Sequence, residues 1–262
     1  MDSGNIGFVL LCAAFVFVMT PGLAMFYGGL VRKKNVVNTM MTSIFIIGIG
    51  IVMWVLFGYS LSFAPSGNAF IGDFRWLGLE GVSLTEGYTD GASIPNMVFS
   101  AFQMMFAVIT PALITGAVAG RMKFKSIFVF TIFWSLIVYY PLAHMVWGQG
   151  GLLGADGIGA LDFAGGDVVH ISSGVSALVL CILLGKRHDY EHSIYRIHNI
   201  PTVVLGASLL MFGWFGFNAG SALAADGLAA HAFMTTGVSA AAAMLSWMLC
   251  DVITVSYTHL TL

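Results

Sequence analysis

Long apolar stretches, separated by more polar segments, follow one another along almost the whole chain. Seven of them reach the length of about 20 residues that a helix needs to cross a bilayer. They cover residues 6–31, 40–63, 94–120, 124–145, 162–185, 201–221 and 229–250. The period-two alternation of barrel strands is missing, and the stretches are too long for such strands. The pattern predicts an all-α polytopic membrane protein with seven transmembrane helices.

The amino-acid composition also indicates that lipid surrounds most of the chain. Hydrophobic residues make up 58% of the chain and charged residues 8%, whereas soluble domains carry roughly 25% charged residues. The sequence has no extended basic patch, so a nucleic-acid partner is not expected. Cys12, Cys181 and Cys250 all fall in apolar stretches without metal-ligand or disulfide spacing. We expect them to be buried small side chains.

Basic residues give the orientation. Nine of the ten follow the first, third and fifth stretches, and only Arg75 lies in the alternate connections. The nine are Arg32, Lys33, Lys34, Arg121, Lys123, Lys125, Lys186, Arg187 and Arg196. The positive-inside rule makes their side cytoplasmic and places the N-terminus outside. The first residues lack the basic region of a signal peptide, so the first stretch is predicted to stay as a span.

The end of the chain departs from this pattern. Residues 252–262 form neither an eighth apolar stretch nor a basic cytoplasmic tail. We therefore expect residues 1–251 to be a transmembrane domain, and residues 252–262 to be a truncated or non-native end, foreign from about Val255 onward.

Ionisable groups inside spans are costly and mark function by default. Counting from Asp162 at about 1.5 Å per residue, His170 lies roughly 12 Å inward, which predicts a pore-lining role. His144 ends the fourth stretch. Asp167 follows two glycines and is a candidate helix N-cap. Asp162 follows a glycine-rich loop and is expected to bond backbone N–H groups at the outer mouth.

Aromatic residues gather where that mouth should lie. Phe217 and Ser221 are four residues apart and share a helix face, with Phe217 one turn deeper. Trp147 closes the fourth stretch, and Phe106 lies in the outer half of the third. Ring faces and a hydroxyl above an apolar constriction suit a small cation. An aromatic belt with ordinary core packing remains the alternative.

These residues also carry a family resemblance. The matching segments are residues 21–29, 101–107, 144–148, 159–166, 169–171 and 213–221. They resemble the ammonium transporter (Amt/Mep/Rh) family, collinearly from about residue 5 to 251. The chain is most similar to the bacterial and archaeal Amt branch.

The resemblance implies eleven spans, built as two inverted repeats of five helices, and a homotrimer with one pore per subunit. The first repeat would cover about 6–186 and the second would begin at about 200–251. The resemblance also implies a location in the cell (inner) membrane and a PII-type regulator. No cofactor and no metal are implied.

Individual residues match the functional positions of the family. Phe106, Trp147 and Ser221 match its external ammonium-binding site, and Phe106 and Phe217 match its phenyl gate. His170 matches the first of two pore histidines, and Asp162 matches the aspartate that supports the outer site. The implied function is ammonium transport, in which ammonium is recruited, deprotonated and passed through the pore as ammonia.

Much of such a transporter lies beyond this chain. The second pore histidine, four spans and the cytoplasmic tail would all follow residue 262. We therefore expect the chain by itself not to transport.

Other classes fit less well. A seven-helix receptor matches the number of spans, but the last stretch has no lysine for a retinal Schiff base. The sequence shows no nucleophile–base pair and no HExxH motif, so an enzyme is not predicted. An unrelated channel is the nearest competitor, although the potassium-filter sequence TVGYG is absent.

Overall fold

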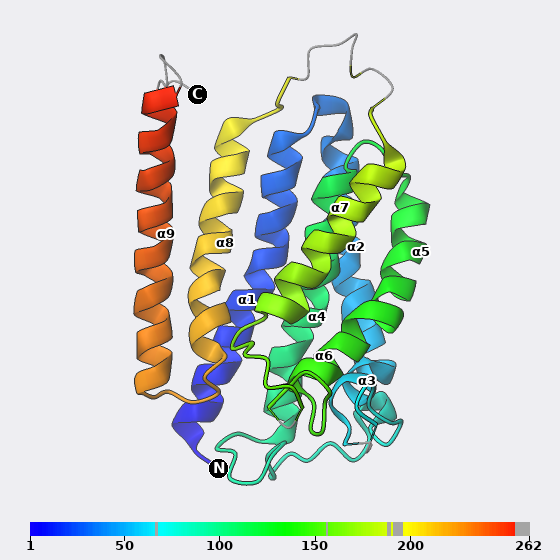
Figure 1. Cartoon of the computed structure of the whole chain (residues 1–262), viewed down its shortest axis with the longest axis vertical. Coiled ribbons are helices and arrows are strands. Elements are labelled where there is room, and N and C mark those ends of the chain that lie inside the picture. Colours follow the sequence, from blue (N-terminus) through cyan, green and yellow to red (C-terminus); the bar gives the residue numbers. More distant parts are fainter. Residues whose placement is uncertain (66–67, 156, 188–189, 191–195, 255–262) are drawn as a thin grey trace.

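The computed structural model describes residues 1–65, 68–155, 157–187, 190 and 196–254, and within these ranges all regular structure is helical (Figure 1). Seven helical segments have the length and hydropathy to cross a membrane, as the sequence predicts. Four are α1 (Ser3–Leu30), α4 (Asn96–Val118), α8 (Ile200–Gly220) and α9 (Gly227–Thr254). Of the expected tail at residues 252–262, residues 252–254 form the end of α9. Residues 255–262 lie outside the described residues, so the expectation for them remains a prediction.

The other three spans contain a π-helical turn. In the second, α2 (Val36–Met53) and α3 (Tyr59–Phe63) are joined by the π turn Trp54–Gly58. In the fourth, α5 (Phe124–Trp134) and α6 (Tyr140–Trp147) are joined by Ser135–Tyr139. In the fifth, the π turn η5 (Gly166–Ile171) leads into α7 (Ser172–Leu184). Such turns bend helices and are frequent at functional sites.

The start of the fifth span corrects the predicted boundary. The sequence pattern begins at residue 162, but the helix begins at Gly166 because Gly165 adopts a left-handed conformation with φ of 109°. His170 lies four positions after Gly166, so its axial distance from the helix start is about 6 Å rather than about 12 Å.

The basic connections gather at one end of the bundle, opposite the N-terminus (Figure 1). Arg32, Lys34, Arg121, Lys186 and Arg187, from three separate connections, line one pocket of about 470 Å³. This clustering agrees with the predicted asymmetry of charge. We call the end that carries the N-terminus the outer end.

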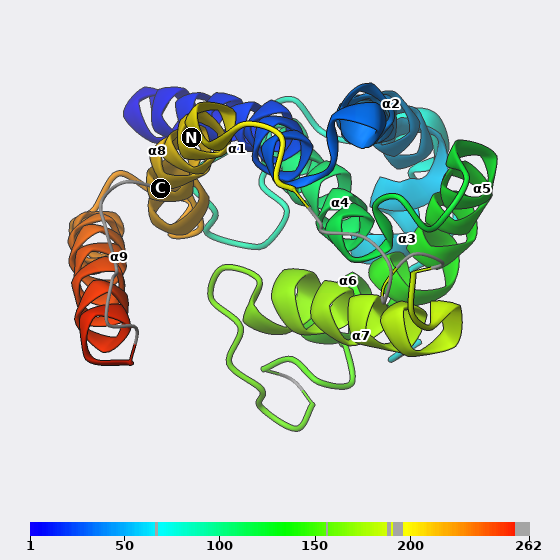
Figure 2. The ribbon, with the colours of Figure 1, turned by 90° about the horizontal axis from the view of Figure 1, so that it is seen from above.

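Glycines allow α1 and α8 to pack closely, side by side (Figure 2). A Cβ atom on Gly206 would lie 2.3 Å from the backbone nitrogen of Phe26, and one on Gly213 would lie 2.1 Å from Cγ of Met19. Since real Cβ atoms do not approach so closely, these positions require glycine at the present helix separation. Close approach through small residues is typical of helices in membranes.

α9 packs against α8 at the edge of the bundle (Figure 2). Within its most apolar window only 6% of the residues are buried, and Trp247 is 74% exposed. Cys250 on this helix is exposed too, so the expectation of burial is wrong there, whereas Cys12 is buried and Cys181 is half-buried.

The outer end is held by polar contacts. His144 is fully buried, and its Nδ1 and Nε2 lie 3.1 Å from the Ser62 carbonyl oxygen and 2.9 Å from that of Asn68. These contacts show that His144 connects the outer loop to α6 and does not line a pathway.

A second polar contact lies within the outer loop. Arg75 Nη2 lies 2.6 Å from Asp73 Oδ2, and this bond holds the pKa of the Asp73 carboxyl below its usual range.

Candidate functional site

A cavity of about 250 Å³ lies at the outer ends of α4, α6 and α8. Its walls include Tyr88, Gln103, Phe106, Trp147, Asp162 and Ser221. Four of these, Phe106, Trp147, Asp162 and Ser221, were predicted from sequence to share a site, and the fold brings them together from four separate segments. Burial raises the pKa of Tyr88 to about 12, so its phenol adds no charge to the cavity near neutral pH.

Trp147 is fixed by a hydrogen bond in the plane of its indole. Its Nε1–H donates to the backbone carbonyl oxygen of Asp162 at 2.9 Å. Its ring centroid lies 6.1 Å from that of Phe106, with the planes at 74°. Because the N–H is already engaged, the indole offers its ring to the cavity, and a ring face attracts cations.

Ser221 presents an acceptor. Its hydroxyl donates to the backbone carbonyl oxygen of Phe217 at 2.8 Å. A hydroxyl has one donor and two lone pairs, so with the proton committed Oγ can accept a hydrogen bond from a ligand in the cavity.

Asp162 caps the fifth helix from four residues before it. Its Oδ1 accepts from the backbone N–H groups of Gly165 and Gly166 at 2.5 and 2.8 Å. Its Oδ2 accepts from those of Asp167 and Val168 at 2.8 and 3.0 Å. These are the otherwise unpaired donors of a helix start. The predicted bonding by Asp162 is confirmed, and the alternative in which Asp167 caps the helix is wrong, because Asp167 contributes a donor to Asp162 instead.

A column of rings leads away from the cavity. The ring centroids of Phe106 and Phe217 are 4.4 Å apart, and both side chains are 1% exposed. Their planes meet at 60°, so the pair is tilted rather than parallel. The His170 ring follows at 5.8 Å from Phe217 and stacks on Trp214 at 5.5 Å with an interplanar angle of 12°.

The sequence model of the Ammonium Transporter Family matches residues 7–261. The chain belongs to the ammonium transporter family. It is 52% identical over 252 residues to an ammonium transporter of Bacillus subtilis, covering 96% of this chain and 60% of that protein. The ammonium transporter Amt1 of Archaeoglobus fulgidus is 42% identical, with 95% of this chain and 60% of that protein covered.

Solved structures give the same result. Mep2 of Saccharomyces cerevisiae superposes with a TM-score of 0.86 at 37% identity, over 96% of this chain and 56% of that chain. The all-helical fold of an ammonium transporter family member is thereby confirmed. The chain spans about 60% of the length of the relatives just named.

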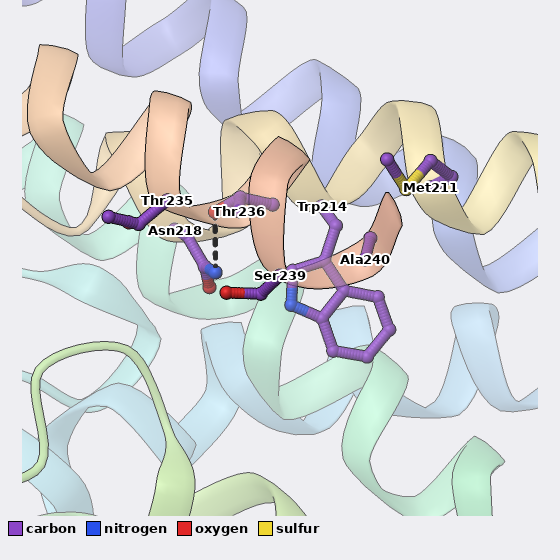
Figure 3. A pocket seen from close by; sticks show the side chains of 7 residues that line it. All are labelled: Met211, Trp214, Asn218, Thr235, Thr236, Ser239 and Ala240. Carbon is purple, nitrogen blue, oxygen red and sulfur yellow. Dashed lines mark hydrogen bonds between the residues drawn. The ribbon is translucent and has the colours of Figure 1, made fainter. Parts of the chain in front are cut away.

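A second pocket in this ammonium transporter family member lies between α8 and α9 and has a volume of about 450 Å³ (Figure 3). Trp214 forms part of its wall together with Met211, Asn218, Thr236 and Ser239. Asn218 Nδ2 donates to Thr236 Oγ1 at 2.8 Å. Sequence reasoning gave no role to Trp214, although its position three residues before Phe217 places it on the same side of the helix.

In the part of the chain that the structure describes, no group of three His, Cys, Asp or Glu side chains is placed to hold a metal ion.

Proposed function

We propose that this chain is the N-terminal part of an ammonium transporter of the cell membrane. The observation that carries the proposal is the cavity in which an indole, a phenyl ring and a hydroxyl acceptor meet directly beside the buried pair of Phe106 and Phe217. Ammonium is recruited there by the rings of Phe106 and Trp147 and by Ser221 Oγ. The names of the relatives support this substrate.

The substrate then transfers one proton to water at the outer mouth and passes Phe106 and Phe217 as ammonia. A cation in such an apolar constriction costs many kcal/mol, whereas the neutral molecule does not. His170 lines the path beyond the phenyl pair and provides hydrogen bonding. Potassium has no proton to lose, so the same constriction excludes it.

Asp162 supports the outer site without contacting the reacting atoms. Its carboxylate fixes the start of the helix that carries His170, and its backbone carbonyl holds the Trp147 indole. One residue thus positions both the recruitment ring and the pore imidazole.

The complete transporter would contain further spans, a second pore histidine and a tail that contacts a PII-type regulator, and would assemble as a homotrimer. Two features of this chain support additional spans beside α8 and α9. The apolar side chains of α9 are largely exposed, and polar groups line the pocket against α8. We expect the chain alone not to transport, and ammonium uptake by the chain alone would contradict this.

Growth on limiting ammonium tests the proposal. The complete transporter that contains this segment is expressed in a host that lacks its own ammonium transporters. Growth is expected to be restored at low ammonium near neutral pH, where free ammonia is scarce. Failure to restore growth, with the protein present in the membrane, would contradict the assigned substrate.

A further inference from the structure

Gln103 lies in the cavity wall with an unused acceptor. It precedes Phe106 by three residues on α4, which puts both on one helix face. The side chain is 8% exposed, and its Oε1 is buried with no hydrogen-bond partner. Sequence reasoning gave it no role.

Such an atom requires an explanation. The large majority of buried polar side-chain atoms have a partner, and an unpaired acceptor is destabilising. The chain's other glutamine provides the contrast. Gln149 donates through Nε2 to the Tyr88 carbonyl oxygen at 2.9 Å, and it does not line the cavity.

The cavity otherwise has few acceptors for a cation with four N–H groups. The Asp162 carboxylate already accepts four backbone N–H groups. Trp147 and Phe106 offer ring faces. Ser221 Oγ offers lone pairs because its proton is donated to Phe217. The Tyr88 hydroxyl oxygen already accepts from the Gln149 N–H at 3.1 Å.

We propose that Gln103 Oε1 is a second hydrogen-bond acceptor for ammonium in this cavity, alongside Ser221 Oγ. The terminal amide turns about its last bond, which exchanges oxygen and nitrogen, so the oxygen can face the bound cation. The inference rests on the proposed function, since it assigns a further residue to the same site. Gln103 would contribute to ammonium affinity and leave later passage unchanged.

The test compares Gln103→Leu, Gln103→Glu and Gln149→Leu in the complete transporter, reconstituted in proteoliposomes. The response to external ammonium is recorded over a range of concentrations, as current or as internal pH. Gln103→Leu is expected to raise the half-saturating ammonium concentration about tenfold, the size of a lost hydrogen bond to a charged group, with the maximal response within about twofold. Gln103→Glu keeps a carbonyl acceptor, and its half-saturating concentration is expected at or below that of the parent.

Gln149→Leu removes an amide of the same size outside the cavity and is expected to leave the half-saturating concentration unchanged. An unchanged half-saturating concentration in Gln103→Leu, or a loss of maximal response alone, would overturn the inference. If Gln103→Leu fails to assemble, a raised half-saturating concentration in Gln103→Glu overturns it. If the parent protein shows no change in current or internal pH with ammonium, the proposed function itself is contradicted, and this inference fails with it.

Discussion

At the scale of single residues, the outer cavity is defined by the Trp147 and Ser221 side chains, whose hydrogen-bond donors are already committed. The Trp147 N–H donates to the backbone carbonyl oxygen of Asp162, and the Ser221 hydroxyl donates to that of Phe217. What remains facing the cavity is ring surface and oxygen lone pairs. A site of this kind attracts a small cation that carries N–H donors.

Replacing Trp147 with leucine removes the largest ring face of the site. A cation–π contact contributes on the order of 1–2 kcal/mol, so we expect the apparent affinity for ammonium to fall about 5- to 30-fold. The measurement is the ammonium concentration at half-maximal transport. Trp147→Phe keeps a ring and should fall less, and an unchanged affinity in Trp147→Leu would argue against recruitment by the indole.

Replacing His170 with glutamate tests the role of the half-buried imidazole. It introduces an ionisable acid beside Phe217 and Trp214. A negative charge there favours cations, so transport rate and selectivity between ammonium and potassium are both expected to change. Currents with each ion measure this, and His170→Gln is the neutral control. If His170→Glu keeps the selectivity and rate of the parent, His170 does not line the pathway.

The sequence predicted the cavity residues that lie in segments resembling the ammonium transporter family. It did not predict residues whose importance depends on contacts with other helices. Phe106, Trp147 and Ser221 stand in such segments, and the structure brings them to one cavity. The stacking of Trp214 on His170 joins two helices. The unpaired Gln103 oxygen is a consequence of packing. Neither is visible in spacing along a single helix.

At the scale of elements, the fifth span depends on a residue outside it. Asp162 bonds four backbone N–H groups of the helix start, although three residues separate it from η5. The sequence pattern placed the helix start at residue 162, because Phe163 and Ala164 continue the apolar stretch up to Gly165. Hydropathy does not indicate that Gly165 adopts the left-handed conformation that ends the loop.

Asp162→Ala should leave these N–H groups without their acceptor. Loss of a cap costs about 0.5–2 kcal/mol, and further unpaired donors add to it. We expect a lower thermal unfolding temperature and a large loss of transport, because η5 carries His170. Asp167→Ala removes a neighbouring acid that does not cap the helix and should unfold near the parent temperature. Equal effects of the two substitutions would contradict the capping role.

The contact between α1 and α8 depends on Gly206. A Cβ there would lie 2.3 Å from the Phe26 backbone nitrogen, so Gly206→Ala must push the helices apart. Overpacking of this kind costs about 1–3 kcal/mol, which should lower the unfolding temperature. Gly48→Ala is the matched control, since its Cβ meets nothing within 4 Å. A Gly206→Ala protein as stable as the parent would show that the two helices do not pack as described.

At the scale of the whole molecule, the number, order and approximate limits of the seven spans could be predicted from hydropathy, and the structure confirms them. How the spans pack could not be predicted in this way, because small residues face one another across helices as readily as they face lipid. The exposed side chains of α9 and the pocket between α8 and α9 are features of arrangement alone.

Charge is also distributed over the whole molecule. Basic side chains line a pocket at one end of the bundle. The candidate recruitment cavity lies at the other end and is built from aromatic rings, oxygen acceptors and the Asp162 carboxylate, which already accepts four backbone N–H groups. This polarity agrees with recruitment of a cation at the outer end, which is the central claim about function.

Charge movement across proteoliposomes on a solid-supported membrane tests that claim most directly. The complete transporter is exposed to equal pulses of ammonium and of potassium, and internal pH is followed in parallel. Recruitment of ammonium at the Trp147 and Ser221 cavity predicts a saturable response to ammonium and none to potassium. Equal currents with both ions, or no response to ammonium in either current or internal pH, would contradict the account.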